Sequence, residues 1–459
     1  MLGRLRVEEL ESRTLLAYAP AQILHAYGFD RLPYDGRGQT IAIVDAYDNP
    51  ALTYDLQNFD QLFGLPDPVL TIAQPQGQPT YNEGWGLETD LDVEWAHAIA
   101  PAADILLVEA KNDYGGNLMA AANYARQQPG VVVVSMSWES NEFPGEKLYD
   151  SDFTTPPGHM GGSGLPGGVT FVAASGDKGA GVVWPASSPN VLSIGGTTLT
   201  LDDSNVIASE IGWSGSGGGL SRYESKPDFQ APFQSTGMRT TPDFAYNADL
   251  ATPFWTYASN FGGLQAVYGT SAGAPQWAGL IALADQALAW KGIGSLDGPT
   301  QTIPELYNLA GSSYSTYFHD IVDGNNGYQA GPGYDMVTGI GTPLADQIVE
   351  ALVNGTQPPG GGASARGGVR WNLSLRGEAM PGPSPLAGAP LPQQGVSIDQ
   401  AVLLFVTGAP LVQLATTPRA GLVERLMETG GGDHALFVES QDAGLAELVM
   451  GSIPGGLRS

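Results

Sequence analysis

A serine in a turn of small residues is the first candidate for chemistry in this 459-residue chain. Ser271 lies in the stretch GTSAGAP at 269–275, and an apolar run of helical type follows at once. Small neighbours leave its hydroxyl open to a bulky substrate, and the amide of a serine that starts a helix can face a developing oxyanion. The same pattern fits a serine that only caps a buried helix. This stretch alone therefore leaves nucleophile and helix cap equally open.

Two carboxylates four residues apart supply a candidate base. Glu88 and Asp92 lie in the segment 87–100, whose apolar residues recur at helical spacing, so the two side chains stack on one side of the predicted helix. In a water-poor setting both cannot easily ionise, and sharing a proton raises the pKa of one of them, which gives a base suited to acid. Because Asp90 and Glu94 are close by, an ordinary solvated acidic face is the alternative.

Asp177 lies in a glycine-bracketed turn, SGDKG at 175–179, after a buried apolar run. It fits a turn-capping residue, or an acid held neutral in an apolar cleft that donates a hydrogen bond to an oxyanion. A histidine base is not evident, because none of the five histidines lies in a His-Gly-Thr-like turn that opens a helix. They are His25, His97, His159, His319 and His434.

A second constellation suits a cation. Asp320 and Asp335 are joined by a glycine-rich segment whose backbone carbonyls are free to bind. Calcium takes six to eight oxygen ligands in flexible geometry, although the spacing here is not that of an EF-hand. An ordinary pair of Asx and glycine turns fits these residues at least as well.

The elements that must position these residues are strands buried on both faces. Five runs are apolar throughout: 40–45, 105–108, 131–137, 169–175 and 191–194. Helix-like segments separate several of them, notably 87–100 and 117–127, which predicts an α/β domain with a mainly parallel sheet. Ligand sites in such folds gather beyond the carboxyl ends of the strands, and Asp45, Ser137 with Trp138, and the 175–177 turn all lie at such ends.

Composition excludes several classes of function. The formal net charge of −28 disfavours nucleic acid and anionic membranes as partners, and a pI near 4.2 suits a protein that tolerates acid. The absence of cysteine excludes disulfides, thiolate catalysis and cysteine-bound metals. No apolar run is long enough for a transmembrane helix, and the N-terminus lacks the pattern of a secretory signal peptide.

The chain divides into four parts. Residues 1–17 are predicted to be a leader or export segment, and their LESRTLL stretch at 10–16 resembles an N-terminal segment of many exported bacterial proteins, which favours secretion. A folded domain is predicted over 18–355, a Gly/Pro-rich linker over 356–392, and a low-complexity tail or small appendage over 393–459. Short helices are predicted in the tail at 399–406 and 420–428.

Taken together, these pieces resemble the sedolisin family of serine-carboxyl peptidases over about 18–355. The likeness is carried by YAPAQI at 18–23 with AYGF at 26–29, ETDLDVE at 88–94, SGDKG at 175–179, GTSAGAP at 269–275, and DI at 320–321 with GPGYDMVTG at 331–339. The serine motif alone fits a subtilisin-like enzyme equally well. The carboxylate pair, the Gly-Asp turn and the calcium-type segment, in this order and without a suitable histidine, make the match specific.

The resemblance implies a subtilisin-like fold and hydrolysis of peptide bonds in acid, as an endopeptidase or a tripeptidyl-peptidase. By matching position, Ser271 would be the nucleophile, Glu88 its general base and acid, Asp92 the residue that tunes Glu88, and protonated Asp177 the oxyanion donor. Ser137 and Trp138 match the family's substrate-lining strand end. One calcium ion would be bound by Asp320, Asp335 and the carbonyls of Ile321, Gly331 and Gly333. We expect a monomer that acts on protein or peptide substrates, with no nucleic-acid or membrane partner.

Two other functions stay open at this point. Family members are generally made with a long N-terminal pro-region, for which a domain start near Tyr18 leaves no room. One alternative is therefore a catalytically inactive, sedolisin-like binding module. The other is a subtilisin-like hydrolase that works at neutral pH and depends on a histidine.

Overall fold

The computed structural model describes residues 17–355, 397–398, 422–428, 434–440 and 447–449, which belong to two separate units. The smaller unit contains an antiparallel sheet of β18 (Leu422–Glu428), β19 (His434–Ser440) and β20 (Glu447–Val449). The helix predicted at 420–428 is therefore wrong, because pairing with β19 overrides the local preference of β18. The leader 1–16, the linker 356–396 and the helix predicted at 399–406 lie outside the described residues.

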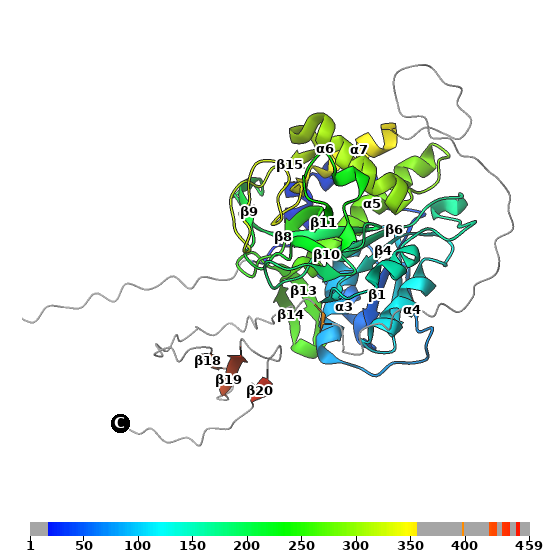
Figure 1. Ribbon diagram of the computed structural model, residues 1–459. Coiled ribbons are helices and arrows are strands. Elements are labelled where there is room, and N and C mark those ends of the chain that lie inside the picture. Colours follow the sequence, from blue (N-terminus) through cyan, green and yellow to red (C-terminus); the bar gives the residue numbers. More distant parts are fainter. Residues whose placement is uncertain (1–16, 356–396, 399–421, 429–433, 441–446, 450–459) are drawn as a thin grey trace, which may run out of the picture. The chain divides into compact units, whose positions relative to one another are not determined.

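The larger unit is built on an eight-stranded sheet (Figure 1). Seven strands lie in the order β12-β8-β6-β4-β1-β3-β2 and every neighbouring pair is parallel, whereas β9 pairs antiparallel with β8. Their bounds are β1 Thr40–Ala46, β2 Leu70–Ala73, β3 Asp104–Ala110, β4 Val131–Met136, β6 Thr170–Ala174, β8 Val191–Leu201, β9 Ile207–Gly212 and β12 Phe244–Asn247. The mainly parallel sheet and all five predicted strands are confirmed.

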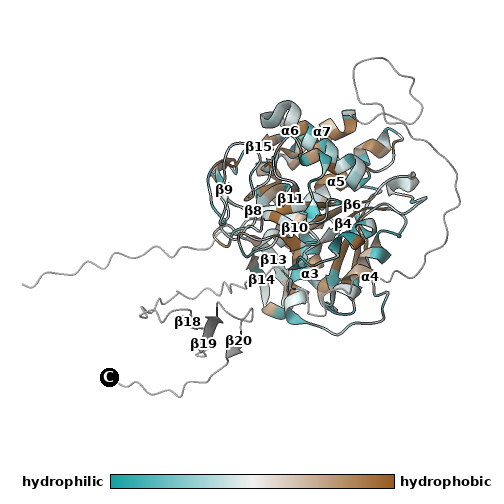
Figure 2. Ribbon diagram, in the orientation of Figure 1, coloured by the Kyte–Doolittle hydropathy of each residue, from teal (hydrophilic) through white to brown (hydrophobic). Residues whose placement is uncertain are grey.

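Helices cover the sheet, which explains why its strands are apolar throughout. In β1, Ile41 and Ile43 pack into one hydrophobic cluster with α3 and α5, while Ala42 and Val44 pack into a second cluster with α4. Figure 2 shows the resulting hydrophobic strands between partly hydrophilic helices. The helices are α1 Pro20–Tyr27, α2 Leu52–Phe63, α3 Glu83–Ile99, α4 Gly115–Ala125, α5 Gly273–Trp290, α6 Ile303–Tyr317 and α7 Ala345–Gly355. In the described part of the chain, no helix combines the length and apolar character that a membrane span requires.

Smaller sheets lie around this central sheet. One joins β5 (Trp138–Asn141) to β7 (Val183–Trp184) and to β17 (Ser397–Ile398), a strand from much later in the chain. The others are the antiparallel pairs β10 Gly219–Ser225 with β11 Met238–Thr241, β13 Phe254–Ala258 with β14 Gly263–Val267, and β15 Phe318–His319 with β16 Thr342–Pro343.

Candidate active site

Ser271 lies in a single 3-10 turn, Thr270–Ala272, that leads directly into α5. The predicted apolar helix behind the serine is thus present, and it is buried almost along its whole length. The turn depends on Gly269, which has φ +128°, a conformation that side chains rarely adopt. A Cβ atom at this position would also lie 2.4 Å from Asp177 Oδ2. Glycine here is therefore what lets Asp177 approach the serine turn.

Asp177 is fixed by that same turn. Its Oδ1 accepts hydrogen bonds from the Thr270 amide at 2.8 Å and from the Thr270 hydroxyl at 2.9 Å. Its Oδ2 is buried and has no hydrogen-bond partner among the described residues. Burial of the carboxyl group raises the pKa of Asp177 to about 7; the two Thr270 bonds oppose the shift, while the charge of Glu139 adds to it. Asp177 can therefore present a proton beside Ser271 in mildly acidic solution.

Glu88 and Asp92 come from α3, which begins after Asn82, whose side chain accepts a hydrogen bond from the Trp85 amide. Glu83, in the first turn of α3, is exposed, but the four other carboxylates of this helix are at most 2% exposed: Glu88, Asp90, Asp92 and Glu94. The alternative of a solvated acidic face is therefore excluded. Asp90 and Glu94 have partners away from the serine turn. Asp90 accepts a hydrogen bond from the Asn49 side chain, and Glu94 accepts one from the Tyr257 amide.

Asp92 is linked to the serine turn through Ser137. The Ser137 hydroxyl donates to Asp92 Oδ1 at 2.9 Å and lies 3.4 Å from the carbonyl oxygen of Ser271. Burial raises the pKa of Asp92 well above its usual value, and the nearby charges of Asp45 and Glu88 raise it further. Ser137 opposes this shift, so the hydroxyl favours the charged form of Asp92.

Glu88 and Ser271 face each other without forming a hydrogen bond of normal geometry. Both Glu88 carboxyl oxygens and Ser271 Oγ are buried, and none has a hydrogen-bond partner among the described residues. Burial raises the pKa of Glu88 well above its usual value, and the neighbouring Ser271 hydroxyl opposes the shift. Asp45 and Asp177 add to it. Catalytic hydrogen bonds are often long before substrate binds, so this geometry suits a base awaiting a reaction.

Asp45 is a fourth carboxylate at this site, beside Glu88, Asp92 and Asp177, and it is not one of the predicted site residues. It lies near the carboxyl end of β1, is fully buried, and neither of its oxygens has a hydrogen-bond partner in the described chain. Burial raises the pKa of Asp45 to about 7. Its charge acts on both Glu88 and Asp92. The available signal was its position at a strand end, where ligand sites gather.

The Trp138 side chain lies in the core and does not line an open cleft. It is completely buried, donates from its indole Nε1 to the Val44 carbonyl at 3.0 Å, and stacks at a tilt against Trp184. The ring therefore supports the end of β1 beside Asp45. Any contact of Trp138 with a substrate has to come from its backbone in β5.

The histidines lie elsewhere. In the four whose side chains the structure describes, each ring has a partner away from Ser271: Asp30 for His25, Asp60 for His97, the Val131 carbonyl for His159 and Glu210 for His319. His434 belongs to β19 in the other unit. The described site therefore offers carboxylates, and no histidine, to a serine nucleophile.

The candidate calcium residues meet in one loop. Asp320 accepts from the Gly333 amide at 3.0 Å, and Asp335 accepts from the Gly331 amide at 3.0 Å and from the amides of Val337 and Thr338. The carbonyls of Ile321, Gly331 and Gly333 receive no hydrogen bond from the described protein. Across that same part of the chain, no three acidic or histidine side chains gather as a metal site. A cation here would depend on two carboxylates and on carbonyl oxygens.

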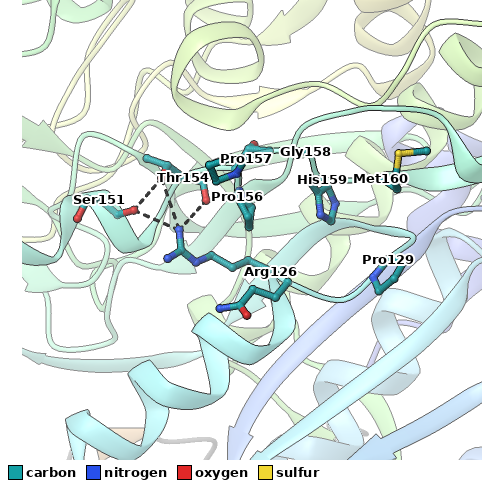
Figure 3. A pocket seen from close by; sticks show the side chains of 11 residues that line it. Arg126, Pro129, Ser151, Thr154, Pro156, Pro157, Gly158, His159 and Met160 are labelled. Carbon is teal, nitrogen blue, oxygen red and sulfur yellow. Dashed lines mark hydrogen bonds between the residues drawn. The ribbon is translucent and has the colours of Figure 1, made fainter. Parts of the chain in front are cut away.

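A pocket also opens near the amino end of β4 (Figure 3). Arg126 lies in its wall, where its guanidinium donates to the carbonyls of Ser151 and Thr154. Ser137 follows the opposite end of β4, and none of the candidate catalytic side chains lines this pocket.

The sequence of this chain is similar to a known peptidase family and to individual peptidases. The Peptidase_S8 model, described as the subtilase family, matches residues 80–303. The chain is 34% identical over 388 residues to kumamolisin from Bacillus sp. (strain MN-32), an alignment that covers 75% of this chain and 65% of that protein. It is 30% identical over 382 residues to sedolisin from Pseudomonas sp. (strain 101), covering 74% and 62%. The chain thus spans slightly less than two thirds of the length of these relatives.

The fold comparison agrees with the sequence matches. A solved structure of Pseudomonas sedolisin, described as a serine-carboxyl proteinase complexed with two molecules of pseudo-iodotyrostatin, aligns with a TM-score of 0.63 and 26% identity. That alignment covers 74% of this chain and 98% of the solved one. The subtilisin-like fold is thereby confirmed, and the chain belongs to the sedolisin family.

Proposed function

We propose that this chain is an acid-active serine-carboxyl peptidase that hydrolyses peptide bonds with Ser271, Glu88, Asp92 and Asp177. The observation that supports it most is the serine turn itself. A buried carboxylate, Glu88, neighbours the Ser271 hydroxyl, and Asp177, whose pKa burial raises to about 7, is bonded to the adjacent Thr270, away from every described histidine. Similarity to kumamolisin and sedolisin supports the same activity.

The proposed reaction depends on the protonation states of Glu88 and Asp177, with Glu88 charged and Asp177 protonated. Glu88 in its charged form takes the proton of Ser271 Oγ as that oxygen attacks the substrate carbonyl carbon. The carbonyl oxygen becomes an oxyanion and accepts a hydrogen bond from Asp177 Oδ2, which protonation turns into a donor. Glu88 then gives its proton to the leaving amine as the C–N bond breaks. Water repeats the sequence on the acyl-enzyme, which releases the carboxylic acid and restores Ser271.

Asp92 and Asp45 adjust the basicity of Glu88. Burial and the charge of Asp45 raise the pKa of Glu88, so Glu88 becomes a stronger base than a free glutamate, and the charge of Glu88 in turn raises the pKa of Asp92. Ser137 holds Asp92 in place through its 2.9 Å hydrogen bond. In this scheme Asp92 and Ser137 act through Glu88 and do not touch the substrate bond.

The pH dependence of Asp177 gives a prediction for two neighbours of opposite charge. Lys178 lies 2.6 Å from Glu139 in an ion pair; the lysine charge lowers the pKa of Asp177 and the glutamate charge raises it. Because activity requires protonated Asp177, Glu139→Gln should move the alkaline limit of kcat/KM to lower pH. Lys178→Gln should move it to higher pH. Profiles that shift in the same direction would contradict the role of Asp177.

The calcium proposal has its own support. We propose that Asp320, Asp335 and the carbonyls of Ile321, Gly331 and Gly333 bind one calcium ion, because these residues lie in one loop and the three carbonyls have no hydrogen-bond donor among the described residues. A bound cation would offset the repulsion between the two carboxylates and hold the loop that follows β15.

Calcium removal is expected to lower thermal stability. A ligand present at 100 to 1,000 times its Kd stabilises the folded state by roughly 2.7 to 4.1 kcal/mol, so a chelator should lower Tm measurably. Asp320→Ala should already melt at the lower temperature and respond little to chelator. A wild-type Tm that is the same with calcium and with chelator would rule out the site.

The proposed activity is tested with a mixed peptide library incubated from pH 3 to pH 8 and analysed by mass spectrometry, beside a Ser271→Ala control. We expect cleavage in acid, declining towards neutral pH, and inhibition by a peptide aldehyde that mimics the tetrahedral intermediate. An inactive binding module would cleave nothing at any pH. A neutral-pH, histidine-dependent hydrolase would show the opposite profile.

We further propose a secreted monomer that acts on protein or peptide substrates. The export-like stretch at 10–16 supports secretion, and the net charge of −28 disfavours nucleic acid and anionic membranes. Light scattering should give a mass near one chain of 47.9 kDa, and the protein should accumulate in the culture medium of its host. A stable dimer, or retention inside the cells, would contradict these assignments.

A further inference from the structure

An ion pair joins two segments that border the nucleophile. Glu139 lies on β5, shortly after Ser137, and Lys178 follows Asp177 in the 175–179 turn. The Lys178 ammonium lies 2.6 Å from Glu139 Oε1. The two members are unequally exposed, since 3% of the Glu139 side chain and 69% of the Lys178 side chain face solvent. The carboxylate is therefore a fixed part of the site, whereas the lysine head lies at its surface on a flexible stem.

The Glu139 carboxylate lies close to the group that would hold the substrate carbonyl. A Cβ atom on Gly176 would be 2.5 Å from Glu139 Oε2, so the carboxylate lies against the backbone just before Asp177. The Gly176 amide donates to the Thr270 hydroxyl at 3.2 Å, and that hydroxyl donates in turn to Asp177. The charge of Glu139 also acts on Asp177. Glu139 is therefore within side-chain reach of a residue whose carbonyl is bound by Asp177.

The backbone of β5 can hold an extended chain beside Glu139. β17 pairs antiparallel with this part of the strand, with Ser397 opposite Glu139 and Ile398 opposite Trp138. Main-chain hydrogen bonds of this kind are open to many sequences, so a peptide substrate can take the same edge. In the direction of β17 such a peptide runs from Glu139 towards Ser137 and the nucleophile. It therefore presents to β5 the residues that precede the bond to be cut.

The charges of this pair favour one kind of substrate side chain. Lysine and arginine stay positive throughout the acid range, so either can take the place of the Lys178 ammonium at Glu139. A charged hydrogen bond to a carboxylate shielded from water is stronger than one in open solvent. An acidic substrate side chain loses its charge near its usual pKa of about 4, so it gains little from Lys178 in acid. A neutral side chain gains nothing from either charge.

We propose that Glu139 selects peptide bonds whose carbonyl belongs to a lysine or arginine residue, and that Lys178 competes with the substrate for the same carboxylate. This inference rests on the proposed peptidase function. The basic side chain displaces the Lys178 ammonium into solvent and forms an ion pair with Glu139, while its own carbonyl oxygen faces Asp177. Glu139 is thus a specificity-determining residue, and Lys178 sets the strength of the preference.

Two peptides that differ at a single residue test this preference. One carries lysine before the cleaved bond, and the other carries norleucine, which has a straight side chain without the charge. Both are incubated with the full chain at about pH 4, and mass spectrometry identifies the bond that is cut. We expect kcat/KM to be higher for the lysine peptide by about tenfold or more. Because both peptides meet the same enzyme population, the protonation state of Asp177 cancels from this ratio.

Three variants test which charges cause the preference. Glu139→Gln should lower the ratio to about one, and Lys178→Gln should raise it about threefold or more, because the substrate then has no competitor. Glu142→Gln is the matched control: Glu142 lies just beyond β5, and its carboxylate accepts from the Ser221 hydroxyl and the Arg222 amide. It should leave the ratio unchanged. A preference that survives Glu139→Gln, or that falls equally in Glu142→Gln, would overturn the proposal.

The remaining outcomes separate this inference from the proposed function. A wild type that cuts both peptides at the same bond with equal efficiency keeps the proposed function and overturns the inference. A preference that arises only when lysine follows the cleaved bond also overturns it. Should Glu139→Gln fail to fold, Lys178→Gln at its exposed position still decides, because an unchanged ratio there contradicts the competition. If neither peptide is cut, the proposed function fails, and this inference fails with it.

Discussion

Ser271→Ala is expected to lower kcat/KM for peptide hydrolysis in acid by about 10⁴-fold or more, because the nucleophile and its base act as one unit. Folding should be almost unaffected. The Ser271 hydroxyl is buried without a hydrogen-bond partner in the described chain, so its removal breaks no bond there. The measurement pairs steady-state kinetics near the acid optimum with urea unfolding of both proteins.

Glu88→Gln is the companion variant, and it tests the role of Glu88 as a base without changing the shape of the site. Glutamine keeps the volume of the side chain but cannot accept the Ser271 proton, so we expect a loss of about 10² to 10⁴ in kcat. Asp104→Asn is a suitable control, because Asp104 is an exposed carboxylate at the amino end of β3. Retained activity in either Ser271→Ala or Glu88→Gln would mean that the reaction uses other residues.

The sheet could be predicted because its physical cause is visible in the sequence. A strand covered by helices on both faces carries a mainly apolar run rather than an alternation of apolar and polar residues, and β1, β3, β4, β6 and β8 each contain such a run. Three strands of this sheet were missed: β2, β9 and β12. β2 and β9 are partly exposed and lack such a run, while β12 has only four residues.

The candidate site was only partly predictable, because local sequence does not reveal burial. The spacing of Glu88 and Asp92 is the same in a solvated helix and in this buried one. Burial depends on α3 packing against both the sheet and α5, which only the fold shows. Asp45 was missed because a single acid at a strand end has no spacing pattern. Likewise, only the packing against Trp184 shows that the Trp138 ring points into the core.

The buried carboxylates lead to the second large prediction, that the folded protein loses stability as pH rises from about 4 to about 7. Burial raises the pKa of Asp45 from 3.8 to about 7, and it also raises the pKa of Asp90, Asp92 and Glu94. Between these pH values the folded state holds protons that the unfolded chain has released. The free energy of unfolding therefore falls with pH in this range.

The size of the effect can be bounded from Asp45, which is fully buried. Its pKa rises by about three units, and at about 1.4 kcal/mol per unit the loss is roughly 4 kcal/mol by the time pH has passed the folded-state value. A loss of this size is already a large part of the 5 to 15 kcal/mol that stabilises a typical domain. Neutral pH should thus weaken the fold as well as deprotonate Asp177.

Urea unfolding at intervals from pH 3 to pH 8 tests this directly. The midpoint should be highest in acid and fall through the neutral range. Asp45→Asn should flatten that fall because it removes one of the protons held only by the folded state, whereas Asp203→Asn, at an exposed position, should change little. A midpoint that stays constant or rises between pH 4 and pH 7 would show that the carboxylates around α3 are ionised in the folded protein. In that case Glu88 would be an ordinary weak base, and the shared-proton account of its basicity would have to be abandoned.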